Sequence, residues 1–260
     1  MIRLLLALTF ACLTGSGIAT PATAERLVSS LSSHQVLITS SFTGTELVLF
    51  GSIERDAATV PRRGGYDLVV TVIGPRQTLV TRKKERVFGI WANAESRTFA
   101  GAPSYLAVLS SRPLDLVAPP DVMSRLEVGL SNVPFSRETS ADVTPSDRQG
   151  MFREALIRLK SERGLYREEA NAVTFLTPNL FRTSIVLPAE APLGLYEVDL
   201  KLFADGTPIA RTSSALEIVK AGIEQFVANA AREHAFLYGL ATVIMALTTG
   251  WLASVVFRRD

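Results

Sequence analysis

Residues 235–257 have the sequence AFLYGLATVIMALTTGWLASVVF, which contains no charged side chain. As an α-helix this stretch would be about 34 Å long, enough to cross the roughly 30 Å hydrocarbon core of a bilayer. Tyr238 and Trp251 lie near its ends, where amphipathic rings favour the membrane interface. A buried helix of a soluble domain is the alternative, but such helices rarely go without charge over this length. The stretch therefore predicts one transmembrane helix.

The residues that follow this stretch predict its orientation. Arg258 and Arg259 come directly after it, and arginines beside a membrane span mark the cytoplasmic side. We therefore expect residues 258–260 to form a short cytoplasmic tail. The rest of the chain is expected on the opposite side of a bacterial inner membrane, which the protein crosses once.

The N-terminus has the features of an export signal. Arg3 is followed by an apolar run over 4–13 and by small residues that end in Ala-Thr-Ala at 22–24. This pattern predicts a signal peptide over residues 1–24, cleaved before Glu25, and hence a periplasmic body. The single cysteine, Cys12, lies inside the signal, so the expected mature chain has no disulfide and no thiol.

Small residues recur at every fourth position of the predicted membrane helix. They are Thr242, Ala246, Gly250 and Ser254. Small side chains let helix backbones approach closely in lipid, so this stripe predicts a seam that packs against another membrane helix. The alternative is chance, because such residues are common in membrane spans.

Between the two ends, the chain has the alternation and turns of a β protein. Tyr66, Leu68, Val70 and Val72 alternate on one face of a predicted strand, with Asp67 and Thr71 on the other. The segments 34–42 and 46–51 are expected to pair through a turn at 43–45. Short apolar runs continue to residue 110. Trp91 lies in one of them and is interpreted as a core residue, with a surface anchor as the alternative. These features predict an antiparallel β-sandwich.

The centre of the chain changes to helical patterns and then returns to strands. Thr144 to Gly164 has the start signals and apolar face of a helix. In the segment 196–202, apolar residues alternate with Glu197, Asp199 and Lys201, which predicts a half-buried strand, and Asp205-Gly206 predicts a hairpin after it. The turn-and-strand style is immunoglobulin-like, which concerns the fold only.

We therefore expect a mainly β fold, an immunoglobulin-like antiparallel sandwich or two, with a small helical insertion and one C-terminal transmembrane helix. The expected segments are a signal peptide (1–24), a first β-rich region (25–118), a helical insertion or linker (119–170), a second β-rich region (171–219), a juxtamembrane helix (220–234), the transmembrane helix (235–257) and the cytoplasmic tail (258–260).

No pattern in the chain predicts catalysis or a bound cofactor. The two histidines, His34 and His234, have no second ligand-type residue at metal spacing, and there is no phosphate loop or nucleophile elbow. A net charge of +2 argues against a dedicated nucleic-acid binder. We expect no enzyme activity, no metal, no cofactor and no nucleic-acid partner.

The most visible charge feature is a group of basic residues in the first β-rich region. They are Arg62, Arg63, Arg76, Arg82, Lys83, Lys84 and Arg86. If the strands bring them together, they predict a patch for an anionic ligand or for lipid headgroups. The alternative is an exposed hairpin that its lysines and arginines keep soluble.

Several short motifs together resemble a known family. They are SSHQVLITSSFTG at 32–44, Ile90-Trp91, SSRPL at 110–114, LYGL at 237–240 and Gly250-Trp251. As a set they resemble an uncharacterised family of alphaproteobacterial transmembrane proteins, over nearly the whole chain after residue 24. The resemblance implies a signal peptide, a periplasmic β-rich domain and a C-terminal single-pass helix. It implies no assigned activity, and its genes often lie beside a permease similar to sulfite exporters of the TauE/SafE type.

These observations favour a membrane-anchored periplasmic accessory or binding protein, associated with an anion permease of the sulfite type. The expected partners are the lipid bilayer and either a membrane protein or a second copy of the chain. Two alternatives stay open: a membrane-tethered periplasmic enzyme of unidentified class, and a structural envelope protein that associates through its sheet edges.

Overall fold

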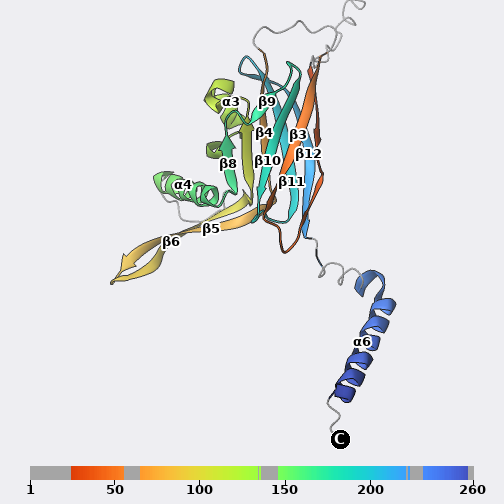
Figure 1. Ribbon diagram of the computed structural model, residues 1–260. Helices are drawn as coiled ribbons and strands as arrows, with labels where there is room; N and C mark the ends of the chain where they lie inside the picture. The colour runs from red at the N-terminus through yellow and green to blue at the C-terminus, as the bar shows by residue number, and fades with distance from the viewer. Residues whose placement is uncertain are drawn as a thin grey trace, which may run out of the picture.

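The computed structural model describes residues 25–55, 65–133, 135, 146–220, 222 and 231–256. The predicted signal peptide, Arg62, Arg63, Arg258 and Arg259 lie outside these residues, as does most of the predicted juxtamembrane helix. Figure 1 shows a body of two layered sheets, a long hairpin that extends from it, and the separate helix α6. The expected mainly β fold with a helical insertion and a C-terminal apolar helix is confirmed.

The first sheet has four antiparallel strands in the order β1-β3-β10-β9. Their bounds are Glu25–Leu31 for β1, Gly44–Arg55 for β3, Leu180–Pro188 for β10 and Val173–Phe175 for β9. At Gly51 the neighbouring strands come so close that a Cβ would lie 2.3 Å from the Val28 carbonyl oxygen and 2.5 Å from the Phe181 ring. A larger residue would separate the strands, so glycine is required there.

The second sheet has six strands in the order β2-β12-β11-β4-β7-β8. The bounds are Gln35–Ile38 for β2, Thr207–Lys220 for β12, Gly194–Ala204 for β11, Asp67–Ile73 for β4, Leu106–Ser110 for β7 and Tyr166–Glu169 for β8. The two edge pairs, β2 with β12 and β7 with β8, are parallel, and the inner pairs are antiparallel. An immunoglobulin-like arrangement stays a prediction.

The predicted hairpin between residues 34–42 and 46–51 is wrong. β2 pairs with β12 in the second sheet, whereas β3 pairs with β1 and β10 in the first. The backbone turns where the Phe42 N–H donates to the Thr39 carbonyl at 3.1 Å, and the chain then changes sheets. Gly44 is no hairpin turn: it faces β10, where a Cβ would lie 2.9 Å from the Leu187 carbonyl oxygen. Pairing with strands far along the chain therefore replaces the local pairing.

The two sheets share one apolar core. Apolar residues of β3, β4, β10 and β11 form a single buried cluster, and burial of each large side chain contributes roughly 1.5–3 kcal/mol. Tyr105, which precedes β7, joins the sheets directly, since its hydroxyl donates to the Val186 carbonyl of β10 at 2.8 Å. Each sheet contains strands from both expected β-rich regions. The two regions therefore build one body.

The hairpin at Asp205-Gly206 is confirmed. Both residues have positive φ, 50° and 77°, and they join β11 to β12. Two positive φ values give a turn whose twist matches that of the flanking strands, and aspartate with glycine is a favoured pair for it. At the other end of β11, the Tyr196 hydroxyl donates to the Pro192 carbonyl at 2.6 Å and fixes the entry of the strand.

A layer of short helices covers the outer face of the six-stranded sheet (Figure 1). It consists of α2 (Leu114–Val117), α3 (Pro120–Arg125), the 3-10 turn η1 (Leu130–Asn132) and α4 (Ser146–Glu162). Val117, Met123 and Val128 are buried against that face. The predicted start of α4 at Thr144 lies outside the described residues, but its predicted apolar face is partly confirmed, because Phe152 and Leu156 are buried.

The basic segment and Trp91 belong to a two-stranded hairpin that extends away from the body (Figure 1). It consists of β5 (Arg76–Val87) and β6 (Ile90–Pro103), and we call it the arm. The base of the arm is held where the Arg97 guanidinium lies 6.0 Å from the ring of Phe152 in α4. The interpretation of Trp91 as a core residue is wrong: it is 72 % exposed, because no third strand or helix of the described residues lies against the outer arm.

The C-terminal apolar stretch forms the helix α6, Ala235–Val256. By length and composition it is able to cross a membrane, and none of the span Ala235–Ser254 is buried against the rest of the described protein. Large apolar side chains such as Phe236 and Leu247 are exposed all along it. An exposed helix of this composition is stable in hydrocarbon rather than in water.

Candidate functional site

A pocket on the outer face of the six-stranded sheet, which we call the charged pocket, contains the buried charged residues Asp199 and Lys201. Its volume is about 270 Å³, and strands β4, β11 and β12, the base of the arm and the end of α3 contribute to its wall. The polar residues on which the argument rests are Thr71, Arg76, Arg125, Asp199, Lys201 and Arg211.

Strand register brings four of these side chains together. In β11 the residues Tyr196, Val198, Leu200 and Leu202 face the core, so Asp199 and Lys201 project from the other face. Asp199 lies opposite Thr71 of β4, and Lys201 lies opposite Arg211 of β12. Facing residues on neighbouring strands are close enough to interact directly.

A buried carboxylate lies at the centre of the pocket. Asp199 is only 2 % exposed, and its two oxygens accept hydrogen bonds from Lys201 Nζ and, at 2.7 Å, from Arg211 Nε. A buried charge is stable only when it is paired, and here one carboxylate pairs with two cations. The hydrogen bond and the charge of Asp199 raise the pKa of Arg211. Asp199, Lys201 and Arg211 together therefore carry a net positive charge.

The hydroxyl of Thr71 adds an unpaired polar atom to this pocket. Thr71 is 3 % exposed, and its Oγ1 has no hydrogen-bond partner among the described residues. A buried hydroxyl without a partner costs about 1–3 kcal/mol. The position is therefore suited to a hydrogen bond with a molecule that enters the pocket.

The remaining charges around the pocket keep it slightly positive. Arg76 and Arg125 add two cations, and Glu127 and Glu197 add two carboxylates. The Arg76 side chain is held in place because its NH1 donates to the Gly101 carbonyl at 3.0 Å. Within the described residues no group of three or more potential metal ligands occurs. The lysine and arginine side chains of the pocket are hydrogen-bond donors only.

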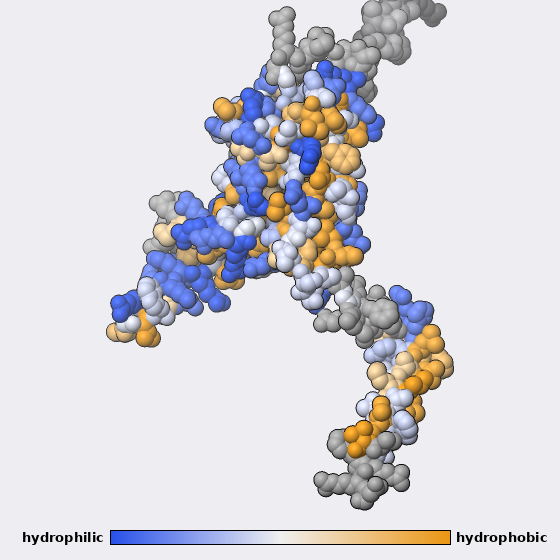
Figure 2. All heavy atoms as spheres, in the orientation of Figure 1, coloured by the Kyte–Doolittle hydropathy of each residue, from blue (hydrophilic) through white to orange (hydrophobic). Residues whose placement is uncertain are grey.

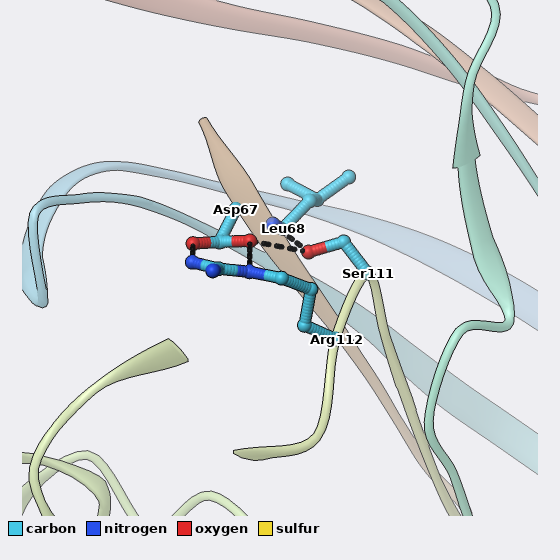
Figure 3. Close-up of polar contacts among 4 residues, drawn as sticks. All are labelled: Asp67, Leu68, Ser111 and Arg112. Carbon is cyan, nitrogen blue, oxygen red and sulfur yellow. Dashed lines mark hydrogen bonds and ion pairs between the residues drawn. The ribbon is translucent and has the colours of Figure 1, made fainter. Parts of the chain in front are cut away.

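A second polar cluster, shown in Figure 3, fastens strand ends together at the far end of β4. The Asp67 carboxylate accepts hydrogen bonds from Ser111 Oγ at 3.0 Å and from Arg112 Nε at 2.7 Å, and it also pairs with Arg112 NH2. The Leu68 N–H donates to the same Ser111 oxygen at 3.1 Å. The hydrogen bond from Arg112 to Asp67 and the charge of Asp67 raise the pKa of Arg112. Because the bonds close on one another, we assign this cluster to the fold rather than to ligand binding.

The predicted basic patch does not form one surface among the described residues. Arg76 lies in the charged pocket at the base of the arm, whereas Arg82, Lys83, Lys84 and Arg86 lie on its outer half. Lys83 pairs with Glu85 at 2.7 Å. Arg62 and Arg63 lie outside the described residues. The structure thus divides the described part of the patch between two places.

Sequence reasoning missed the centre of the charged pocket. It took Asp199 and Lys201 as the solvent side of a half-buried strand, which is wrong, because both are buried. The available signal was two opposite charges on one strand face, followed by Arg211 after the Asp205-Gly206 hairpin. The hairpin places Arg211 beside Asp199 and Lys201, but this position can be seen only from the strand register.

The predicted helix seam lies on α6. Thr242, Ala246 and Gly250 follow one face of the helix with Ser254, and a Cβ at Gly250 would meet no described atom within 4 Å. The Thr242 hydroxyl donates to the Gly239 carbonyl at 2.7 Å, so it is satisfied within the helix. The stripe is thus open to a partner, and its role as a seam stays a prediction.

Comparison with known protein families places the chain in one of them. The model of a family described as "Putative transmembrane protein (Alph_Pro_TM)" matches residues 26–259. The match covers the β-rich body and α6 together. No curated protein matches the chain.

Proposed function

Since the chain belongs to the Alph_Pro_TM family of transmembrane proteins, we propose that it is a membrane-anchored accessory protein that binds a small anion in the charged pocket. In this proposal residues 1–24 export the body to the periplasm, and α6 anchors it in the inner membrane with Arg258 and Arg259 on the cytoplasmic side. The partner is a membrane protein, with an anion permease of the sulfite-exporter type as the first candidate.

The observation that carries the proposal is the unpaired Thr71 hydroxyl beside two cations that share one carboxylate. Asp199 already accepts from Lys201 and Arg211, so it has little capacity left for a bound cation. Both cations retain further N–H donors, since a lysine has three and an arginine five. An oxyanion has several acceptor oxygens, so it can accept hydrogen bonds from the Thr71 hydroxyl and from these donors at the same time.

The experiment compares stability with and without a simple oxyanion. Full-length protein in detergent is heated in sodium sulfite, in sodium sulfate, and in sodium chloride of equal ionic strength. Binding to the folded state alone raises stability by mass action, by about 2.7 kcal/mol at roughly 100 times the dissociation constant. We expect an oxyanion to raise the unfolding temperature above the chloride value.

Two variants make the test specific to the charged pocket. Thr71→Val has nearly the same shape and removes the unpaired hydroxyl. Without an oxyanion we therefore expect this variant to be as stable as the wild type or more stable. With an oxyanion its unfolding temperature should rise less than that of the wild type. Lys84→Gln on the outer arm removes a charge of the same sign away from the pocket and should keep the full gain. Equal gains in wild type and Thr71→Val, or no gain in wild type, would exclude the pocket as an anion site.

A further inference from the structure

The tip of the arm exposes large apolar side chains that nothing in the described protein covers. Phe88, Ile90 and Trp91 are 102 %, 70 % and 72 % exposed, respectively. Figure 2 shows this apolar tip at the end of a hydrophilic stem. An exposed cluster of aromatic and aliphatic side chains marks an interaction site rather than an ordinary soluble surface.

The turn at the tip is not explained by local folding. Phe88 and Gly89 form a two-residue turn with φ values of 48° and 87°, very close to the 50° and 77° of Asp205-Gly206. Such turns favour asparagine, aspartate or glycine at the first position, and a bulky residue is strained there. The chain uses aspartate in one turn and phenylalanine in the other. Phe88 is therefore explained better by what the tip contacts than by turn formation.

The stem next to the tip is basic. Residues 82–96, the outer part of the arm, contain four basic and two acidic residues. Arg82, Lys84 and Arg86 are exposed on β5, within a few residues of the tip. An apolar tip with aromatic rings above a basic stem matches the order of layers in a bilayer with anionic lipid, from acyl chains to headgroups.

The sheet topology places the arm at the end of the body that leads to the membrane helix. β4 and β12 both pair with β11 in antiparallel fashion, so they point in the same direction. β4 leads into the arm after Ile73, and β12 leads toward α6 after Lys220. The arm and the chain that connects to α6 therefore leave the same end of the six-stranded sheet.

The reach of the arm is comparable with that of the connection. From Arg76 to the turn, β5 extends for about 40 Å at 3.3 Å per residue. The chain between Lys220 and residue 231 spans at most about 40 Å when fully extended. A body held by α6 thus stays within reach of the bilayer through its arm.

From these observations we infer that the arm tip inserts Phe88, Ile90 and Trp91 into the interface of the bilayer that holds α6, while the basic stem binds anionic headgroups. The arm and α6 would then hold the body at two points. This inference is independent of the charged pocket, and a failure of anion binding there would leave it intact.

The two tryptophans of the chain make the test direct. In Trp251→Phe, Trp91 is the single remaining tryptophan. This full-length variant is reconstituted into vesicles of phosphatidylcholine with a minority of phosphatidylglycerol, with and without bromine on the acyl chains. We expect blue-shifted emission, loss of most of the intensity in brominated vesicles, and weak quenching by aqueous iodide.

A matched control places the reporter at the opposite end of the body. β7 runs against β4, so α2, which follows it, lies away from the arm, and Leu116 in α2 is 60 % exposed. The control variant is Leu116→Trp combined with Trp91→Phe and Trp251→Phe. Its emission should be red-shifted, quenched by iodide and unaffected by bromine.

Two further variants separate insertion from folding. Phe88→Asn in the Trp251→Phe background suits the turn better, so the unfolding temperature should hold or rise while quenching by bromine falls. If the basic stem binds anionic headgroups, bromine quenching of Trp91 should depend on phosphatidylglycerol. The triple variant Arg82→Gln, Lys84→Gln and Arg86→Gln should remove that dependence. If Trp91 behaves like the Leu116→Trp reporter, or is shielded only when another membrane protein is present, the bilayer is not the partner of the tip.

Discussion

At the level of single residues, three tyrosine hydroxyls hydrogen-bond the core to the backbone. Tyr105, Tyr166 and Tyr196 are buried, and each donates a hydrogen bond to a backbone carbonyl, of Val186, Pro103 and Pro192 respectively. Burial raises the pKa of all three above the ordinary value near 10. Between that value and the raised one, the folded chain therefore holds protons that the unfolded chain has lost.

This arrangement predicts a loss of stability in alkali. The contribution of the neutral tyrosines is fully present below about pH 10, and it falls as the pH rises further, because the unfolded state then binds fewer protons. Tyr105→Phe should lower stability at neutral pH by about 1 kcal/mol through the lost hydrogen bond. It should also make the alkaline loss shallower. Thermal unfolding of both proteins across this pH range measures the two effects, and parallel pH profiles would contradict the assignment.

Single residues also show where sequence patterns stop being sufficient. Asp199 and Lys201 have the alternation of an exposed strand face, but both are buried in a pocket whose wall includes the base of the arm and the end of α3. Trp91 lies in a segment with the composition of a core strand, but among the described strands β6 pairs only with β5. In both cases burial depends on what covers a face, and this is set by segments far away in the chain.

At the level of elements, local signals were sufficient for some elements and not for others. The Asp205-Gly206 turn, the strand after Pro192 and the helix α6 depend on residues within a few positions of one another, and all three are confirmed. The sheet edges depend on distant partners. β2 pairs with β12, about 180 residues further on, so no local pattern predicts its position.

The helix α6 carries the prediction about a membrane partner. Replacement of Ala246 and Gly250 by leucine fills the stripe of small residues, while the helix stays apolar and able to span the bilayer. We expect these substitutions to abolish co-purification of the partner from detergent extracts. Met245→Leu, on a different face, is the control and should leave co-purification unchanged. A partner that is still retained by the Ala246 and Gly250 variant would show that the stripe is not the seam.

At the level of the whole molecule, the topology places the arm and the chain that leads to α6 at the same end of the body. The charged pocket includes Arg76 at the base of the arm, so it lies near that same end. A small anion held there would be close to the bilayer and to any transport protein that packs against α6. The arrangement thus links the proposed binding site, the arm and the anchor without requiring a catalytic residue.

Alkaline carbonate extraction of membranes tests the central claim, that α6 holds the protein in a bilayer, most directly. Membranes from cells that express the full chain are washed with carbonate and compared with those from cells that express a variant ending at residue 234. The account predicts that the full chain stays in the membrane pellet and the shortened variant is released. Release of the full chain into the supernatant would contradict it.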